Sequence, residues 1–198
     1  MSLLPWYALY SRPRHEKKLA DLLNEKGIEA YTPVWKVLKQ WSDRKKWVEE
    51  PLIRSYCFVR ANPAWYYEAL NTHGAVRYVW FSGKPAPIPD RQINTLKVLV
   101  GSAIPVETVT GNLKPGSLVK VTAGPLIGTI GELISIAGRK KVIIRIDHLE
   151  TALSVTISPL LLEKLPEGYV VDDSGVQKIK DSANQQKKEE IKKYKRFW

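Results

Sequence analysis

A stretch rich in β-branched residues fills much of the second half of this 198-residue chain. Between Ser117 and Ile157, 16 of 41 residues are Val, Ile or Thr, which favour strands because their branched side chains pack well on a pleated surface. Turn residues interrupt the stretch at Gly124-Pro125, Gly138-Arg139 and His148-Leu149-Glu150. The spacing predicts four or five short strands that form a small β-barrel.

The turn at Gly124-Pro125 has a simple physical explanation. Gly124 supplies the positive φ or close backbone approach that a tight turn needs, and Pro125 fixes φ and removes an unused donor. Gly131 permits a bulge or a close crossing where the barrel closes on itself. The side chains expected to alternate into the interior are those of Val119, Val121, Ile130, Ile134, Ile144, Ile146 and Val155. Any small barrel can use such turns, so the pattern predicts a fold and leaves the function open.

The first half of the chain alternates between strand and helix patterns. Residues 6–10 favour a strand, and apolar residues at helical spacing follow between Pro13 and Gly27, which ends that helix. Residues 29–48 read as a hairpin, because strand-forming residues flank the polar stretch 42–46.

The same half continues with two more helices. A strand is expected at residues 55–60, and Asn62-Pro63 supplies a cap and a first position for a helix through Leu70. Residues 76–81 favour a strand, prolines then force an extended connection, and Asp90 is expected to cap a last helix. The order β-α-β-β-β-α-β-α predicts an α/β unit.

These patterns divide the chain into four parts. We expect an α/β domain at residues 1–101, a linker at 102–112, the barrel at 113–165 and a tail at 166–198. The tail is polar and ends in a Lys and Glu run with few apolar anchors, so we expect it to be largely disordered.

The net charge favours a polyanionic partner. The chain carries 31 Lys and Arg against 20 Asp and Glu, a formal charge of +11, and phosphates gain from clustered cations through counterion release. A basic surface that binds nothing specific remains the alternative. Charge therefore favours, without proving, a nucleic acid or a nucleic-acid machine as partner.

The sequence lacks the residues that several kinds of site or segment require. Cys57 is the single cysteine and there are three histidines, so neither a disulfide nor a closed zinc site is expected. No Gly-x-Ser-x-Gly elbow or Gly-Lys-Ser/Thr phosphate loop is present, and we expect no catalytic residue, no metal and no cofactor. No apolar run reaches the length of a membrane span, and Met1 to Tyr10 does not look like a signal peptide. We expect a monomer in a reducing cytoplasm.

Two groups of motifs carry a family resemblance. The first comprises Trp6-Tyr7-Ala8-Leu9-Tyr10, His15-Glu16-Lys17-Lys18, Pro51 to Val59 and Gly74-Ala75-Val76-Arg77-Tyr78-Val79. The second runs from Leu113-Lys114-Pro115-Gly116 to Gly131, includes Gly124, Pro125, Gly128 and Gly131, and is similar to the KOW motif. Over residues 6–165 the chain resembles NusG-type transcription elongation factors, and its hairpin 41–47 and segment 84–89 resemble the UpxY-type paralogues that antiterminate polysaccharide operons. The resemblance implies an α+β fold with an NGN-type α/β sandwich followed by an SH3-like barrel.

The resemblance also implies a partner for the first domain. The family's amino-terminal domain grips the clamp helices of RNA polymerase, and the matching residues here are Tyr10, Ile53, Tyr56 and Phe58. Aromatic rings suit such a contact because they bury large areas with few rotatable bonds. Alternatively, Tyr56 and Phe58 face the domain's own helices. This chain has Ile53-Arg54-Ser55 where the family usually has Phe-Pro-Gly, so the turn can differ.

Basic residues at the helix entry and on the hairpin suggest a second contact. They are Arg12, Arg14, His15, Lys17, Lys18, Arg44, Lys45 and Lys46. In an elongation complex they could lie along the non-template DNA strand, with bases stacked on Trp41 or Trp47. Alternatively, the charges are solvated and the two indoles stack on each other across the strands.

The partner of the barrel is left open. Related barrels recruit a small ribosomal protein or Rho, using a Phe after the Gly-Pro pair, but here Leu126 and Ile127 occupy that turn. The dense Val and Ile content disfavours refolding into helices. We expect an antitermination factor that suppresses pausing without chemistry of its own. The alternative is a ribosome-associated or RNA-binding KOW protein.

Overall fold

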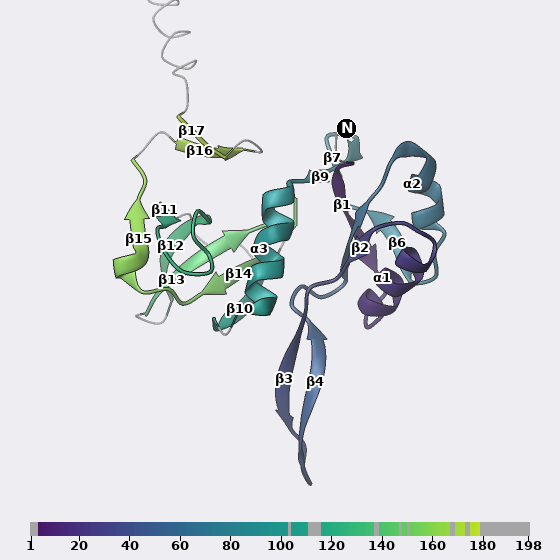
Figure 1. Cartoon of the computed structure of the whole chain (residues 1–198), viewed down its shortest axis with the longest axis horizontal. Coiled ribbons are helices and arrows are strands. Elements are labelled where there is room, and N and C mark those ends of the chain that lie inside the picture. The colour runs from purple at the N-terminus through teal and green to yellow at the C-terminus, as the bar shows by residue number, and fades with distance from the viewer. Residues whose placement is uncertain are drawn as a thin grey trace, which may run out of the picture. The chain divides into compact units, whose positions relative to one another are not determined.

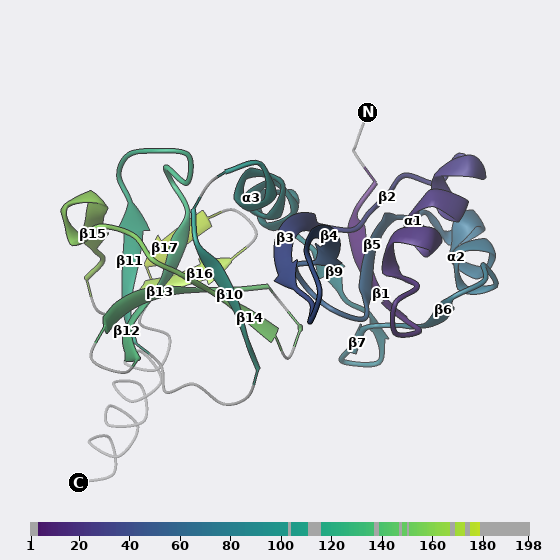
Figure 2. The ribbon, with the colours of Figure 1, turned by 90° about the horizontal axis from the view of Figure 1, so that it is seen from below.

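The computed structural model describes residues 4–102, 104–110, 116–136, 139–146, 148–149, 151–166, 169–172 and 175–178. The chain divides between Glu163 and Lys164 into two compact units. Within the first unit, an α/β part is followed by a six-stranded sheet. Figures 1 and 2 show these elements.

The α/β part contains three helices and nine strands among the described residues. Its elements are β1 (Trp6–Ser11), α1 (Glu16–Glu25), β2 (Ala30–Tyr31), β3 (Val34–Gln40), β4 (Lys45–Pro51), β5 (Tyr56–Arg60), α2 (Pro63–Leu70), β6 (Ala75–Tyr78), β7 (Trp80–Phe81), β8 (Lys84–Pro85), β9 (Pro87–Ile88) and α3 (Asp90–Gly101). Five strands form one antiparallel sheet in the order β2-β5-β1-β6, with β9 also paired to β1. The predicted order of the major elements is confirmed.

Two local signals act as the sequence predicts. Gly27 follows α1 with φ of +78°, a left-handed conformation that favours glycine. At the start of α2, the Asn62 side chain accepts a hydrogen bond of 2.8 Å from the Trp65 amide, and Pro63 takes the first helical position.

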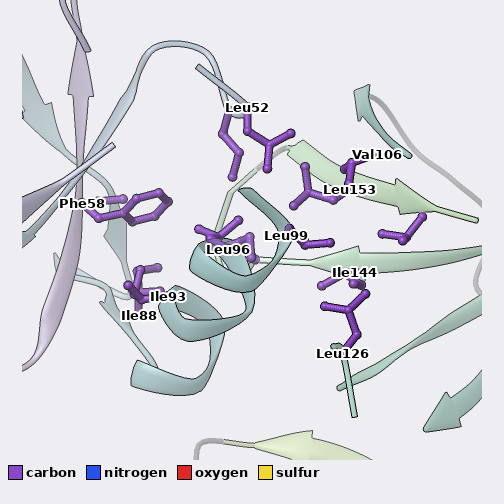
Figure 3. Close-up of a cluster of buried hydrophobic side chains, with 14 of the residues drawn as sticks. Leu52, Phe58, Ile88, Ile93, Leu96, Leu99, Val106, Leu126, Ile144 and Leu153 are labelled. Atoms are coloured by element: carbon purple, nitrogen blue, oxygen red, sulfur yellow. The ribbon is translucent and has the colours of Figure 1, made fainter. Parts of the chain in front are cut away.

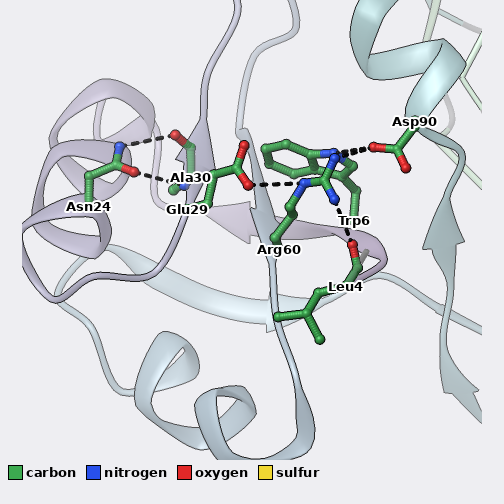
Figure 4. Close-up of polar contacts among 7 residues, drawn as sticks. All are labelled: Leu4, Trp6, Asn24, Glu29, Ala30, Arg60 and Asp90. Atoms are coloured by element: carbon green, nitrogen blue, oxygen red, sulfur yellow. Dashed lines mark hydrogen bonds and ion pairs between the residues drawn. The ribbon is translucent and has the colours of Figure 1, made fainter. Parts of the chain in front are cut away.

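The expectation for Asp90 is wrong. Pro89 is the N-cap residue of α3 and makes no side-chain capping bond, while Asp90 lies in the first turn. Its carboxylate accepts a 2.9 Å hydrogen bond from the Trp6 indole and pairs with Arg60 (Figure 4). Arg60 also reaches the Leu4 carbonyl at 3.0 Å and Glu29 at 3.0 Å. This network joins β1, β5 and α3.

The central strands have both faces covered. On β5, Cys57 and Val59 pack into a cluster with Leu19 and Leu23 of α1, whereas Phe58 packs into a second cluster with Leu96 of α3. Figure 2 accordingly shows α1 and α2 on one side of the sheet and α3 on the other. Alternate residues of β5 therefore belong to different cores.

The strands β3 and β4 form a separate two-stranded ribbon. Figure 1 shows this ribbon projecting away from the five-stranded sheet. Its register pairs Val34 with Pro51 at one end and Gln40 with Lys45 at the other, and the Trp41 amide donates to the Arg44 carbonyl across the turn. The predicted hairpin is confirmed.

The second part is a six-stranded sheet in which β10 to β14 pair in antiparallel fashion. Its strands are β10 (Val106–Thr110), β11 (Ser117–Val121), β12 (Ile130–Ile136), β13 (Arg139–Arg145), β14 (Thr151–Val155) and β15 (Leu162–Lys164), in the order β10-β14-β13-β12-β11-β15. The short 3₁₀ helix η1 (Pro159–Leu161) precedes β15. Strands β11 to β14 agree with the strand pattern of the sequence.

The segment expected to be a linker differs from that expectation. Residues 106–110 form β10, which pairs along its whole length with β14. The Thr108 hydroxyl donates a 2.8 Å hydrogen bond to the Leu52 carbonyl, and Val106 belongs to the same buried cluster as Leu96 and Leu153 (Figure 3). Four of the five residues of β10 are Val or Thr, which favour strands, and β14 supplies the strand with which they pair. Residues 103, 111 and 112 of the segment lie outside the described residues.

The tail also contains structure. In the second unit, β16 (Tyr169–Asp172) and β17 (Gly175–Lys178) pair as an antiparallel hairpin, where we expected disorder. Residues 179–198 lie outside the described residues.

Candidate functional site

Tyr10 and Tyr56 form an aromatic pair on adjoining strands. They lie directly opposite each other in the β1–β5 register, and their ring centroids are 5.4 Å apart at 86°. Both side chains are half-buried, and the Arg77 guanidinium lies 5.5 Å from the Tyr10 ring centroid. Edge-to-face packing holds the rings in place while part of each faces solvent.

Ile53 and Phe58 do not belong to that exposed surface. Both side chains are fully buried. Figure 3 shows the Phe58 ring directed toward α3, and Phe58 belongs to the same buried cluster as Ile93 and Leu96 of that helix. The expectation that these two residues make an external contact is therefore corrected. The two-residue period of a strand assigns Phe58 to one face of the sheet, but it does not reveal that a helix covers that face.

The turn that leads to Tyr56 is fixed from α1. Glu16 is buried, and its carboxylate accepts a 2.7 Å hydrogen bond from the Ser55 amide. Ser55 itself has φ of +63°, and the Leu52 amide donates to the Pro33 carbonyl at 2.7 Å. Ser55 therefore lies in the left-handed region, and its amide is held by a carboxylate. This contact positions Tyr56 beside Tyr10.

The cations of the helix entry fall into different environments. Arg12, Arg14 and Lys18 are exposed. His15 is half-buried, its ring lies 5.4 Å from that of His73, and its Nδ1 is 3.1 Å from the Pro13 carbonyl. Lys17 is exposed as well, so the structure leaves four of these side chains open to solvent and packs His15 against the protein.

Lys17 is engaged with the ribbon. Its Nζ donates a 2.5 Å hydrogen bond to Glu49 on β4. This hydrogen bond raises the pKa of Lys17 and lowers the pKa of Glu49. Sequence reasoning missed Glu49, because the partners are far apart in the chain and no local pattern links them.

The hairpin end of the ribbon is exposed. Arg44, Lys45 and Lys46 all face solvent, and Arg44 lies 3.9 Å from Asp43. The Trp41 and Trp47 side chains are 55% and 63% exposed. Trp47 lies opposite Leu38 in the register, and in the described part of the chain no ring contact joins the two indoles. The alternative in which they stack on each other is therefore wrong.

The glycines of the KOW-like segment occupy the positions that require them. Gly124 and Gly128 have φ of +86° and +82° around a turn closed by the Gly128 amide on the Val121 carbonyl at 2.8 Å. A Cβ on Gly131 would lie 2.6 Å from Val142, so this residue permits close approach of β12 and β13. Pro125 is exposed within the turn, Leu126 is buried, and Ile127 is exposed.

The described residues offer no setting for metal or thiol chemistry. No group of three His, Cys, Asp or Glu residues among them could hold a metal ion. Cys57 is buried, and burial raises the pKa of its thiol to about 12. No described helix is long and apolar enough to cross a membrane.

The solved structures that are similar to this chain share little sequence identity with it. One, described as "Domain interaction in Thermotoga maritima NusG", shares 22% identity with a TM-score of 0.48 and covers 82% of this chain and 97% of its own. Conformation B of the MjSpt4:Spt5 complex shares 15% identity with a TM-score of 0.28 and covers 87% and 95%. Conformation A shares 14% identity with a TM-score of 0.26 and covers 81% and 97%.

A family model matches the first part of the chain. No curated protein matches the sequence. Residues 4–97 match the model described as "NusG: Transcription termination factor nusG". This range comprises just under half of the 198 residues of the chain. The matched range runs from the start of the described chain into α3 and includes Tyr10, Tyr56 and the β3–β4 ribbon. Over residues 4–97 this protein is therefore similar to the NusG family of transcription factors.

Proposed function

We propose that this protein is a transcription elongation and antitermination factor that binds RNA polymerase. The family match over residues 4–97 is the observation that carries the proposal. The factor works without catalysis, as a cytoplasmic monomer that holds the polymerase clamp closed and suppresses pausing. The UpxY-like hairpin and segment 84–89 favour action at specific polysaccharide operons.

The polymerase contact is centred on Tyr10 and Tyr56. These rings are half-buried side by side, so they present apolar area that a helical hairpin of the clamp can cover. Ile53 and Phe58 act from inside, where their burial fixes the strand and turn that carry Tyr56. Arg77 lies over Tyr10 and adds a cation at the edge of this surface.

The basic residues of the helix entry extend this surface toward DNA. Arg12, Arg14 and Lys18 are exposed near the start of α1, and we place the non-template strand along them. The six-stranded sheet is a KOW-containing SH3-like barrel that stays in the β form. It presents Ile127 at the Gly124–Gly128 turn to a partner such as a small ribosomal protein or Rho.

Co-purification with polymerase tests the proposal. A tagged full-length chain is expected to retain polymerase subunits from a native lysate after nuclease treatment. Tyr56→Ala and Tyr10→Ala should each reduce the recovery by roughly tenfold or more, because truncating a central aromatic removes a large share of interface energy. Tyr67→Ala is the matched control, since Tyr67 is 70% exposed on α2 and lies outside the proposed contact.

A tagged protein that recovers no polymerase subunits but retains RNA supports the RNA-binding alternative. Retention of ribosomal RNA in the absence of polymerase, with all three variants equal to the wild type, would exclude the polymerase contact. Circular dichroism of each variant checks that lost recovery does not reflect unfolding.

A further inference from the structure

The turn at residues 52–55 ends at Ser55, directly before β5 begins with Tyr56. The Ser55 carbonyl accepts a 2.8 Å hydrogen bond from the Ser11 amide, and the Ser55 amide donates a 2.7 Å hydrogen bond to the Glu16 carboxylate. Of these two partners, Ser11 bonds through its backbone and Glu16 through its side chain. The conformation at Ser55 therefore depends on a group that a single substitution can remove.

Ser55 has a backbone conformation that a side chain disfavours. Its φ of +63° lies in the left-handed region, where the Cβ of an L-residue comes too close to a carbonyl oxygen. A serine at this position needs an interaction that offsets this cost. The bond to Glu16 suits that role, because a hydrogen bond to a carboxylate is stronger than one between neutral groups.

Tyr10 and Tyr56 form the last pair of the β1–β5 register. The register of β1 against β6 also shifts between Tyr10 and Ser11. A pair at the end of a ladder, beside an irregularity, opens more easily than a central pair. The geometry of the two rings, which lie 5.4 Å apart, therefore depends on how firmly the next residue of β5's approach, Ser55, is held.

The Glu16 carboxylate is buried for this bond. Glu16 is 4% exposed, in the first turn of α1, and its backbone carbonyl accepts a 3.1 Å hydrogen bond from the Thr32 hydroxyl. Burying a carboxylate is costly unless hydrogen bonds compensate for the lost water. The Ser55 amide supplies such a bond, so the helix and the turn hold each other in place.

We propose that Glu16 is a positioning residue for the polymerase contact: its carboxylate holds Ser55 in the left-handed region and thereby presets the Tyr56 ring for binding. The proposal rests on the proposed function for the identity of the partner. A side chain that is already ordered loses less conformational entropy when the partner binds, so the preset ring adds affinity. Glu16 itself acts only through Tyr56.

The other end of the turn offers a matched control. The Leu52 carbonyl accepts a 2.8 Å hydrogen bond from the Thr108 hydroxyl, and the Leu52 amide donates a 2.7 Å hydrogen bond to the Pro33 carbonyl. The side chains of Leu52 and Ile53 are buried in a core cluster, which fixes this end without the hydroxyl. Thr108→Val therefore removes a hydrogen bond from the same turn without releasing Tyr56.

The affinity of the full-length protein for purified RNA polymerase tests the proposal. Glu16→Ala should weaken binding by about 3-fold to 10-fold, part of the value of a hydrogen bond to a charged group. Glycine adopts the left-handed region freely, so adding Glu16→Ala to Ser55→Gly should cost less than about 2-fold. Thr108→Val and Glu25→Ala, which removes an exposed acid of α1, should bind as the wild type does.

A double-mutant cycle separates positioning from a direct contact. If Glu16 acts through Tyr56, the double variant Glu16→Ala/Tyr56→Ala should bind no more weakly than Tyr56→Ala alone. Losses that add would mean that Glu16 contributes by another route and would overturn the proposal.

Nuclear magnetic resonance of the free protein reports the ring geometry without polymerase. Edge-to-face rings shift each other's proton resonances, so the Tyr10 and Tyr56 ring signals should move in Glu16→Ala. They should return toward their wild-type positions when Ser55→Gly is added. Urea midpoints measured alongside show which variants are folded. If Glu16→Ala does not fold, Glu16→Gln supplies the comparison, because its amide oxygen is a weaker acceptor of the same shape.

Unchanged ring signals in the Glu16 variants, or wild-type polymerase affinity in folded Glu16→Ala, would overturn the inference. So would a loss of affinity that Ser55→Gly fails to rescue. The proposed function fails on a different result, a wild-type protein that does not bind polymerase at all.

Discussion

The indole Nε1 of Trp6 donates a 2.9 Å hydrogen bond to Asp90, which stands 84 positions later in the sequence. The carboxylate also pairs with Arg60, whose guanidinium lies 4.9 Å from the Trp6 ring centroid. Trp6 is buried. One side chain at the start of α3 therefore ties that helix to two strands of the five-stranded sheet.

Replacing Asp90 should lower stability. Asp90→Ala leaves the buried Trp6 N–H without its acceptor, and an unsatisfied buried donor costs about 1–3 kcal/mol. Urea denaturation should show this difference relative to wild type. Asp43→Ala is the control, because Asp43 is exposed in the hairpin turn. Equal midpoints for the two variants would show that the Trp6–Asp90 bond adds nothing measurable.

Gly131→Ala should destabilise the six-stranded sheet. A Cβ at this position would lie 2.6 Å from Val142 Cγ1 and 2.7 Å from the Ile143 carbonyl oxygen, so β12 and β13 must move apart. Overpacking of this kind costs about 1–3 kcal/mol. Gly101→Ala should be neutral or slightly stabilising, because its Cβ meets no atom within 4 Å at the end of α3. Thermal denaturation of both variants gives the comparison.

The contact between Lys17 and Glu49 should depend on pH. The Glu49 pKa is lowered in the folded protein, so its contribution is present above the unfolded pKa and is lost as pH falls through the folded pKa. The Lys17 pKa is raised, so its contribution is lost as pH rises through that value. Carboxyl chemical shifts should give a titration midpoint for Glu49 that lies below the ordinary pKa of a glutamate side chain. Lys17→Gln should move that midpoint upward, and an unmoved midpoint would exclude the contact in solution.

Cys57 should resist thiol reagents until the protein unfolds. The thiolate is the reactive form, and burial raises the thiol pKa to about 12, so little thiolate forms near neutral pH. An absorbance assay with an aromatic disulfide should give no fast labelling of native protein and one thiol per chain in denaturant. Fast labelling of native protein at neutral pH would mean that β5 is not covered on the Cys57 side.

Local chemistry explains the parts that sequence reasoning predicted correctly. Gly27, the Asn62 cap and the Gly124 turn each act within a few residues, so their consequences follow from neighbouring residues. The polar hairpin turn between β3 and β4 is of the same kind. These signals predict where elements begin and end.

Which side chains are exposed depends on contacts between residues that are distant in the sequence. Phe58 has the alternation expected of a strand, but its exposure depends on α3, which begins at Asp90. Asp90 is a good capping residue by type, yet Trp6 and Arg60 compete for its carboxylate. In the same way, pairing with β14 made residues 106–110 a strand.

The sequence by itself determined the order of elements in the α/β part, the glycine-dependent turns and the basic, aromatic character of the hairpin. Tertiary structure decided which of those aromatics face solvent: it buried Phe58 under α3 and left Trp47 exposed on an isolated ribbon. The physical reason is that backbone conformation depends mainly on neighbouring residues, whereas exposure depends on which distant element packs over a side chain.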